Sequence, residues 1–154
     1  MDSFDFLVVG GGIAGLTYAL QVADSGSVAV LFKKEIHNSS TAWAQGGIAA
    51  VSGKDDDFSL HIDDTLVAGA GLCKRETVEL VVKEAPLRIQ ELISRGAAFD
   101  KEGGEYHLHK EGGHSRRRIY HTADATGFEI HRALLQAAEQ HPNIVFLPFH
   151  SAID

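Results

Sequence analysis

The sequence predicts an α/β fold with a Rossmann-like parallel sheet, and three neighbouring segments lead to this prediction. A short apolar run at residues 4–9 stops at three glycines, apolar residues then recur at helical spacing from residue 13, and a second apolar run occupies residues 28–32. A strand, a helix and a strand within about 30 residues form a βαβ unit. Such a unit implies parallel strands joined by a right-handed crossover.

The helix of this unit is expected to begin at residue 13, where the apolar spacing changes. The side chains that can share one of its faces are Ile13, Leu16, Leu20 and Ala23. We expect Gly26 to end the helix, because glycine commonly follows helix C termini. The next run, Val-Ala-Val-Leu-Phe, is typical of a strand buried on both faces.

Two more helices are expected in the middle of the chain. Asp57 or Ser59 can cap a helix that runs to about residue 68. Residues 75–95 repeat apolar side chains at helical spacing. Pro86 lies inside this range and should kink or divide the helix, because proline has no N–H to donate.

A small hairpin is expected as an insertion after the βαβ unit. Gly96 should end the long helix, and residues 97–99 and 106–109 then flank Gly103-Gly104, a pair that favours a tight turn. The insertion therefore interrupts the Rossmann-like part of the chain.

A last helix and strand should follow the insertion. Asp124 or Thr126 can cap a helix that ends before Pro142, and residues 144–149 should form another buried strand. No closing element follows this strand, so we expect residues 1–154 to be the amino-terminal part of a larger domain.

Composition narrows the classes of function. A hydrophobic content of 44% suits a globular domain, and a net charge of −7 with one short basic run at residues 116–118 disfavours a nucleic-acid partner. No apolar run is long enough to span a bilayer or to serve as a signal peptide, so we expect a cytoplasmic protein without a membrane partner. Cys73 is the single cysteine, which excludes an internal disulfide.

The glycines after the first predicted strand indicate a phosphate-binding turn. The segment Gly10-Gly11-Gly12-Ile13-Ala14-Gly15 matches the pattern G-x-G-x-x-G between a strand and a helix. The first glycine permits a tight turn, the second lets a pyrophosphate approach the backbone, and the third lets the helix pack on the strand. Backbone N–H groups and the helix dipole would hold the phosphates.

The end of the second strand departs from the usual NAD site. An acidic residue is common there and bonds the ribose hydroxyls, but Phe32 and Lys33 occupy the place. Lys33 is either a cationic contact to the ribose or adenine end of a cofactor or an exposed lysine at a strand end.

Together these segments resemble the succinate dehydrogenase and fumarate reductase flavoprotein superfamily and, within it, the L-aspartate oxidases. The resemblance covers nearly the whole chain. Its segments are Val8–Leu16, Ser40–Ala50, Asp63-Asp64-Thr65 with Ala68–Gly71, Glu111–Ser115 with Arg117-Arg118-Ile119, and His121 with Ala123–Gly127.

The resemblance implies FAD as the cofactor. Gly11 to Ala14 would contact its pyrophosphate, and Lys33 matches a position that touches the cofactor in these oxidases. A further segment would run along FAD toward its isoalloxazine ring; it consists of Ser40, Thr41, Ala42, Trp43, Ala44, Gln45, Gly46 and Gly47. Trp43 would pack against the cofactor or be an ordinary, partly buried aromatic.

Two residues distinguish branches of the superfamily. Membrane-complex relatives bond the flavin covalently through a histidine where this chain has Ser40, so the resemblance implies non-covalent FAD. Glu111 matches a glutamate thought to orient the substrate, and a carboxylate can pair with the ammonium group that distinguishes aspartate from succinate. Taken alone, Glu111 would be a solvated loop glutamate.

The function implied by the resemblance is oxidation of L-aspartate to iminoaspartate, with oxygen or fumarate reoxidising the flavin. This reaction is the first step of quinolinate and NAD synthesis, which suggests a functional link to quinolinate synthase. The proton-transfer arginine, the capping domain and the helical carboxy-terminal domain of relatives would lie beyond this chain. The alternatives are a soluble fumarate reductase or succinate dehydrogenase flavoprotein, and a non-catalytic nucleotide-binding module.

A metal site is not expected from the sequence. His107, His109 and His114 have spacing that can bind zinc, but no nearby cysteine or motif supports it. The sequence therefore favours the reading without a metal.

Overall fold

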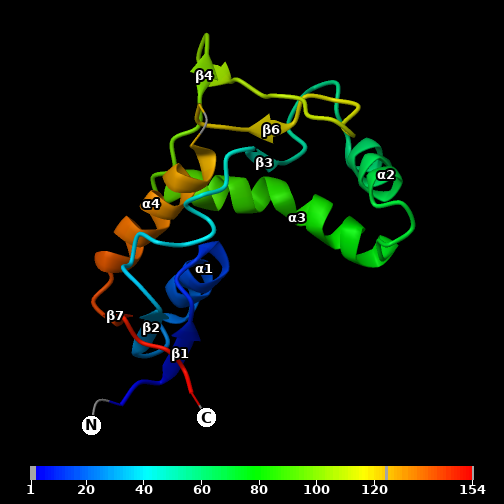
Figure 1. Ribbon diagram of the computed structural model, residues 1–154. Coiled ribbons are helices and arrows are strands. Elements are labelled where there is room, and N and C mark those ends of the chain that lie inside the picture. The colour runs from blue at the N-terminus through cyan, green and yellow to red at the C-terminus, as the bar shows by residue number, and fades with distance from the viewer. Residues whose placement is uncertain (1–2, 124, 154) are drawn as a thin grey trace. The chain divides into compact units, whose positions relative to one another are not determined.

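The computed structural model describes residues 3–123 and 125–153 (Figure 1). The chain divides into two compact units, which we describe separately. The first unit contains the chain up to Gln45, Arg95–Ala97 and the chain from Gly127 onward; the second contains Gly46–Ser94 and Ala98–Thr126.

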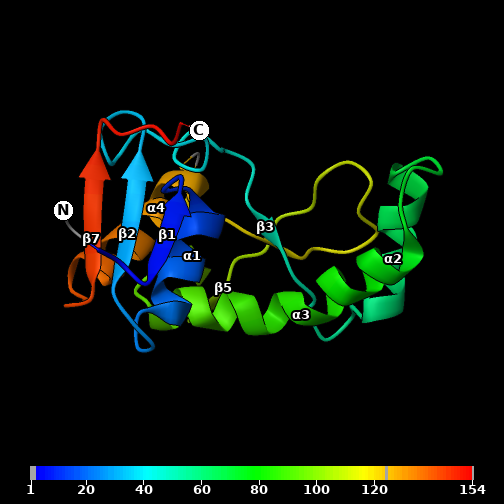
Figure 2. The same cartoon turned by 90° about the horizontal axis from the view of Figure 1, so that it is seen from below.

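The first unit is built on a three-stranded parallel sheet. Its elements are β1 (Phe6–Val9), α1 (Ile13–Val22), β2 (Val28–Phe32), α4 (Thr126–Glu139, whose first residue belongs to the second unit) and β7 (Ile144–Pro148). The strand order is β1-β2-β7, and both pairings are parallel. Figure 2 shows the three arrows pointing the same way, with α1 and α4 on one side of them. The predicted Rossmann-like parallel sheet is confirmed.

Burial in this unit follows from the central place of β2. All five residues of β2 are buried, as the unbroken apolar run predicts. Leu16 and Ala19 are the buried residues of α1, whereas Ile13, which we expected on the buried face, is exposed. β7 is only partly buried, contrary to the prediction, because it lies at an edge of the sheet.

Gly26 does not end the first helix, so this prediction is wrong. The helix stops at Val22 with Ala23 as its C-cap. A Cβ on Gly26 would lie 2.8 Å from a carboxylate oxygen of Asp5, which accepts hydrogen bonds from the backbone and hydroxyl of Ser27. The glycine is therefore explained by close packing before β2.

The second unit contains two helices and two small antiparallel sheets. Its elements are β3 (Ile48–Ala49), α2 (Phe58–Ala68), α3 (Arg75–Ser94), β4 (Lys101–Glu102), β5 (Glu105–Tyr106) and β6 (Ile119–Tyr120). β3 pairs with β6, and β4 pairs with β5. Ile62 of α2 packs with Val78 and Val82 of α3 in the core of this unit.

The boundaries of α2 and α3 test the predicted cap, the predicted effect of Pro86 and the predicted terminating glycine. Asp57 caps α2 by accepting a hydrogen bond from the Leu60 N–H, so Asp57 rather than Ser59 is the cap. α3 passes through Pro86 as one helix and is not divided there. Gly96 follows this helix with a φ of +92°, the conformation expected of a terminating glycine.

The predicted hairpin is present, but its strands are shorter and its first strand lies later than expected. Gly103 and Gly104 have φ values of +60° and +90° and connect β4 to β5 directly. Two positive φ angles favour the type I′ turn that matches strand twist. The first strand is residues 101–102, not 97–99.

The last helix ends before Pro142, as predicted, and Thr126, one of the two predicted caps, is its first residue. The alternative cap, Asp124, lies outside the described residues. Within residues 3–123 and 125–153, no helix is both long and apolar enough to cross a membrane.

Candidate functional site

The glycine turn between β1 and α1 has the geometry that its sequence predicts. Gly10 has a φ of +105°, which favours glycine. A Cβ on Gly15 would overlap the Gly10 carbonyl oxygen, so α1 lies directly against the turn. These two glycines let the helix begin immediately beyond the strand.

Backbone donors gather where α1 begins. The N–H of Ile13 donates to the Thr41 hydroxyl at 3.0 Å, which ties the 39–45 loop to the helix start. Among the residues that the structure describes, the N–H groups of Gly12 and Ala14 have no acceptor. Such donors at the positive end of a helix dipole suit an anion such as a phosphate.

A cavity of about 570 Å³ opens at the carboxyl ends of β1 and β2. The predicted site residues that line it are Gly10, Gly11, Gly12, Lys33, Ser40 and Thr41. Further lining residues are Val9, Leu31, Phe32, Lys34, Asn38, Ser39, His150, Ser151 and Ala152. Its position agrees with the rule that ligands of parallel α/β sheets bind beyond the carboxyl ends of the strands.

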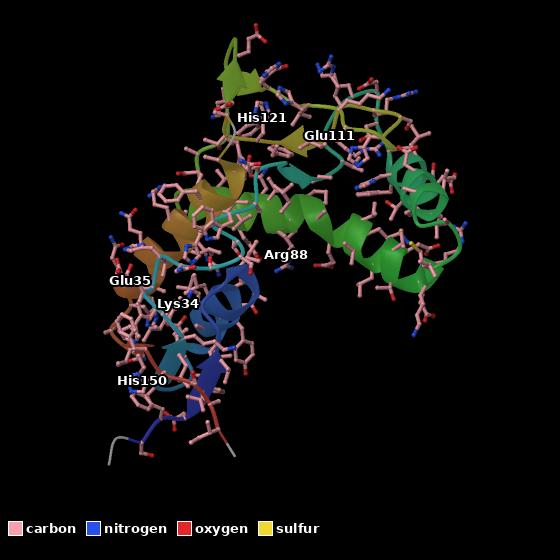
Figure 3. All side chains as sticks on the ribbon, in the orientation of Figure 1. Lys34, Glu35, Arg88, Glu111, His121 and His150 are labelled. Carbon is pink, nitrogen blue, oxygen red and sulfur yellow. The ribbon has the colours of Figure 1, made fainter. Side chains whose placement is uncertain are left out.

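Sequence reasoning missed the contribution of the chain after β7. The N–H of His150 donates to the Phe32 carbonyl at 3.0 Å, and the N–H of Phe149 donates to the Lys34 carbonyl at 3.4 Å. These bonds bring residues 150–152 to the cavity (His150 is labelled in Figure 3). The parallel sheet could have predicted this contribution, because β7 is parallel to β2 and ends at the same edge of the sheet.

Two side chains support the glycine turn from within the protein. A Cβ on Gly11 would overlap the ring of Phe32, which packs edge-on against Phe146 at a centroid distance of 5.2 Å. The buried Nε2 of His131 lies 2.8 Å from the Gly11 carbonyl oxygen, which makes the neutral ring a donor to that oxygen. Burial lowers the pKa of His131, so the neutral form is favoured.

The loop that follows Ser39 is held against the start of α4. The N–H of Gly127 donates to the Ala44 carbonyl at 2.9 Å, and a Cβ on Gly127 would overlap the Thr41 carbonyl oxygen. Sequence reasoning gave Gly127 no such role. Glycine has a low helix propensity, so its presence in the first turn of a helix could have indicated a close approach of another segment.

Several predicted cofactor residues do not line the cavity. They are Ile13, Ala14, Gly15, Ala42, Trp43, Ala44, Gln45, Gly46 and Gly47. Trp43 is 77% exposed in this structure. Gly47 has a structural reason of its own, because with a φ of +127° its Cβ would lie 2.5 Å from the Ile119 side chain.

Glu111 lies in the second unit, on the loop between the hairpin and β6 (Figure 3). It is exposed, and its carbonyl accepts the N–H of His114 at 3.2 Å in a turn that includes Gly113 with a φ of +88°. The backbone N–H and hydroxyl of Ser115 both donate to one oxygen of Asp64, at 2.7 and 2.8 Å. The glutamate is therefore carried by a loop that is anchored to α2.

A buried ion network completes this anchor. Arg118 is fully buried and donates to Asp56 and Asp64 at 2.7 Å each. Burial alone would raise the pKa of Asp64, but the hydrogen bonds from Ser115 and Arg118 outweigh it and lower the pKa to about 2. Burial beside the Arg118 cation also lowers the pKa of His61, which lies 3.2 Å from that guanidinium.

The first unit thus has what a dinucleotide site requires. Its cavity lies within the usual range of about 300–1,000 Å³ for small-molecule sites, a glycine turn and helix start supply backbone donors, and Lys33 and Lys34 add positive charge at the rim. The residues present therefore fit a dinucleotide such as FAD. Separately, the second unit carries the Glu111 carboxylate on an anchored loop.

A protein family and several curated proteins match nearly the whole of this chain. Residues 5–154 match the family described as FAD binding domain. The L-aspartate oxidase 2-a of Nicotiana tabacum, described as chloroplastic, is 57% identical over 152 residues, which are 98% of this chain and 24% of that protein. The L-aspartate oxidase of Yersinia pestis is 49% identical over 155 residues, which are 97% of this chain and 29% of that protein.

Solved structures agree with the fold. A quinol fumarate reductase of E. coli matches with a TM-score of 0.90 at 31% identity, over 95% of this chain and 26% of that one. The chain spans about a quarter of the length of the curated relatives it matches.

Proposed function

Because this chain belongs to the FAD-binding domain family, whose cofactor is FAD, we propose that it is the amino-terminal FAD-binding part of an L-aspartate oxidase. The reaction is oxidation of L-aspartate to iminoaspartate, with oxygen or fumarate as the final acceptor. FAD, when bound, supplies the acceptor for the hydride that leaves the substrate α-carbon. The activity belongs to the whole protein, including the domains that relatives carry beyond this segment.

Within this proposal, the residues of the first unit bind and orient the cofactor. The donors at the start of α1 hold its pyrophosphate, and Lys33 contacts its ribose or adenine end. Ser40 lines the cavity and carries a hydroxyl, not an imidazole, so FAD is held without a covalent bond. The protein's part is binding and orientation, since the redox chemistry is that of the cofactor.

Glu111 gives the site its preference for an amino acid. Its carboxylate pairs with the substrate ammonium, which succinate and fumarate lack. The observation that carries this proposal is the anchoring of its loop by Ser115, Asp64 and Arg118, because a charge on a fixed loop discriminates between substrates better than one on a mobile loop.

The second candidate is a soluble fumarate reductase or succinate dehydrogenase flavoprotein, favoured by the close structural match to the E. coli enzyme. Turnover of L-aspartate and of succinate by the full-length protein separates the two. We expect aspartate-dependent reduction of the flavin and little with succinate. Succinate turnover that exceeds aspartate turnover would favour the second candidate.

A place in NAD synthesis belongs to the same proposal. Iminoaspartate is unstable in water, so a quinolinate synthase is the partner that should consume it. We propose a cytoplasmic location, although the Nicotiana relative is described as chloroplastic. Cell fractionation with an antibody against the protein tests the location.

A further inference from the structure

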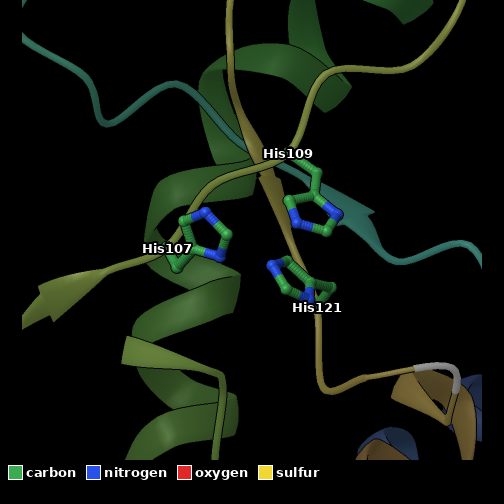
Figure 4. Close-up of side chains that lie close together, drawn as sticks. All are labelled: His107, His109 and His121. Carbon is green, nitrogen blue, oxygen red and sulfur yellow. The ribbon is translucent and has the colours of Figure 1, made fainter. Parts of the chain in front are cut away.

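Three histidine side chains gather beside the hairpin in the second unit (Figure 4). They are His107 just after β5, His109 in an isolated bridge to Ile119, and His121 just after β6. One ring nitrogen from each can be chosen so that all three lie within 4.8 Å of one another. None of these side chains has a role in the proposed cofactor site or substrate contact.

Backbone hydrogen bonds hold the three positions together. The N–H of His109 donates to the Ile119 carbonyl at 2.9 Å, and the N–H of His107 donates to the Asp100 carbonyl at 3.0 Å. The N–H of Asp100 in turn donates to the His121 carbonyl at 2.9 Å. His107 and His109 are two residues apart in extended chain, so their side chains emerge on the same side.

His121 supplies the strongest sign that a ligand is expected. It is 5% exposed, and its Nε2 has no hydrogen-bond partner among the described residues. A buried polar atom without a partner is costly. Its Nδ1 lies 3.2 Å from the Asp100 carboxylate, although not in hydrogen-bonding geometry. A small ring rotation would let Asp100 accept from Nδ1 and leave Nε2 to bind a metal.

The three rings are closely packed, and a carboxylate lies beside them. The rings of His109 and His121 stack at a centroid distance of 3.5 Å, a contact that two protonated rings would destabilise. Glu102 lies 3.9 Å from Nε2 of His107 and adds negative charge beside the cluster.

We propose that His107, His109 and His121 bind a divalent transition-metal ion, for which Zn²⁺ is the best-suited candidate. Imidazole nitrogen is a preferred ligand of such ions, at about 2.0–2.1 Å from zinc. The exposed rings of His107 and His109 must turn toward Nε2 of His121 to reach that distance. Water or Glu102 takes the fourth position. The ion would join the hairpin to the chain after β6.

The sequence analysis grouped His107 and His109 with His114 and disfavoured a metal because no nearby cysteine or motif supported one. The structure places His114 elsewhere, with its ring packed edge-on against His61 at 5.6 Å. The third ligand in the present proposal, His121, follows a strand that only the fold brings to the hairpin.

The test is a calorimetric titration of chelator-treated, FAD-loaded full-length protein with Zn²⁺. We expect one ion per chain from this site, with affinity reduced on the order of 100-fold in His109→Gln and about 10-fold in Asp100→Asn. His37→Gln is the matched control, since His37 is exposed and lies in the first unit, and it should bind as the wild type does. Binding should also weaken as the pH is lowered, because protons compete with the metal ion for the imidazole nitrogens.

A direct measurement avoids reliance on variants that fold poorly. Long-range ¹H–¹⁵N spectra of the histidine rings should show Zn²⁺-dependent shifts of His107, His109 and His121. The proposal is overturned if Zn²⁺ binds wild type and His109→Gln equally, if His37→Gln loses the ion as well, or if the three rings do not respond.

Discussion

Asp64→Asn should destabilise the unit that carries the Glu111 loop. One oxygen of Asp64 accepts from the backbone N–H and hydroxyl of Ser115 and from the Arg118 guanidinium, at 2.7 to 2.8 Å. Asparagine keeps a carbonyl oxygen there but removes the negative charge. The buried Arg118 would then retain only Asp56 as its counterion.

The magnitude follows from the pKa of Asp64. A fall from 3.8 to about 2 at 1.36 kcal/mol per pKa unit gives about 2 kcal/mol. The side chain of Asp64 is 17% exposed, and solvent screening reduces the effect to on the order of 1–2 kcal/mol. With a urea slope of about 1–3 kcal/mol per M, the midpoint should fall by roughly 1 M at pH 7.

The pH dependence has a definite sign. The folded-state pKa of Asp64 is below its ordinary value, so its contribution is present above pH 4 and is lost as the pH falls toward 2. The difference between wild type and Asp64→Asn should therefore shrink over that range. Urea unfolding followed by circular dichroism measures it.

The neighbouring Asp63 provides the matched control. It is exposed on the same helix, so Asp63→Asn should leave the midpoint nearly unchanged. Equal destabilisation by the two substitutions, or a difference between wild type and Asp64→Asn that does not change from pH 7 to pH 2, would refute the assigned network.

Three further predictions concern the cofactor site of the full-length protein. Gly12→Val should strongly reduce FAD occupancy, because even a Cβ would lie 3.3 Å from the Thr41 hydroxyl and the larger side chain would obstruct the pyrophosphate; unchanged flavin absorbance in a folded variant would contradict this. Gly11→Ala should destabilise the protein by about 1–3 kcal/mol, because the new methyl group would overlap the ring of Phe32. Thermal unfolding should show that the double variant Gly11→Ala/Phe32→Ala recovers part of the lost stability, and no recovery would contradict the assigned overlap. Acid precipitation should release all FAD because Ser40 cannot form the covalent bond, whereas flavin fluorescence retained in the washed protein pellet would exclude non-covalent binding.

Local signals in the sequence predicted the elements more accurately than their boundaries. The buried strand β2 and the tight turn at Gly10 are both confirmed. Each depends on only a few consecutive residues, which is why the sequence predicts them. Gly26 and Gly47 have causes in distant residues, Asp5 and Ile119, that a reading along the chain does not reveal.

The candidate site also has parts that the local sequence predicts and parts that depend on distant residues. The glycine turn was visible as a motif, whereas His150 reaches the cavity only because β7 pairs beside β2. Phe32 was recognised as a departure from the usual pattern, but its packing against Gly11 depends on the sheet. Long-range packing therefore determines the parts that sequence reasoning missed.

The most direct test of the proposed function is the ratio of aspartate oxidation to fumarate reduction in full-length Glu111→Gln. This substitution preserves size and most hydrogen bonding but removes the charge that pairs with the substrate ammonium. Aspartate oxidation should lose on the order of 2–4 kcal/mol of transition-state stabilisation, while fumarate reduction changes much less. The ratio cancels general losses of folding or FAD content. An equal loss in both reactions, or no loss in either, would contradict the assignment of Glu111 as the residue that selects aspartate.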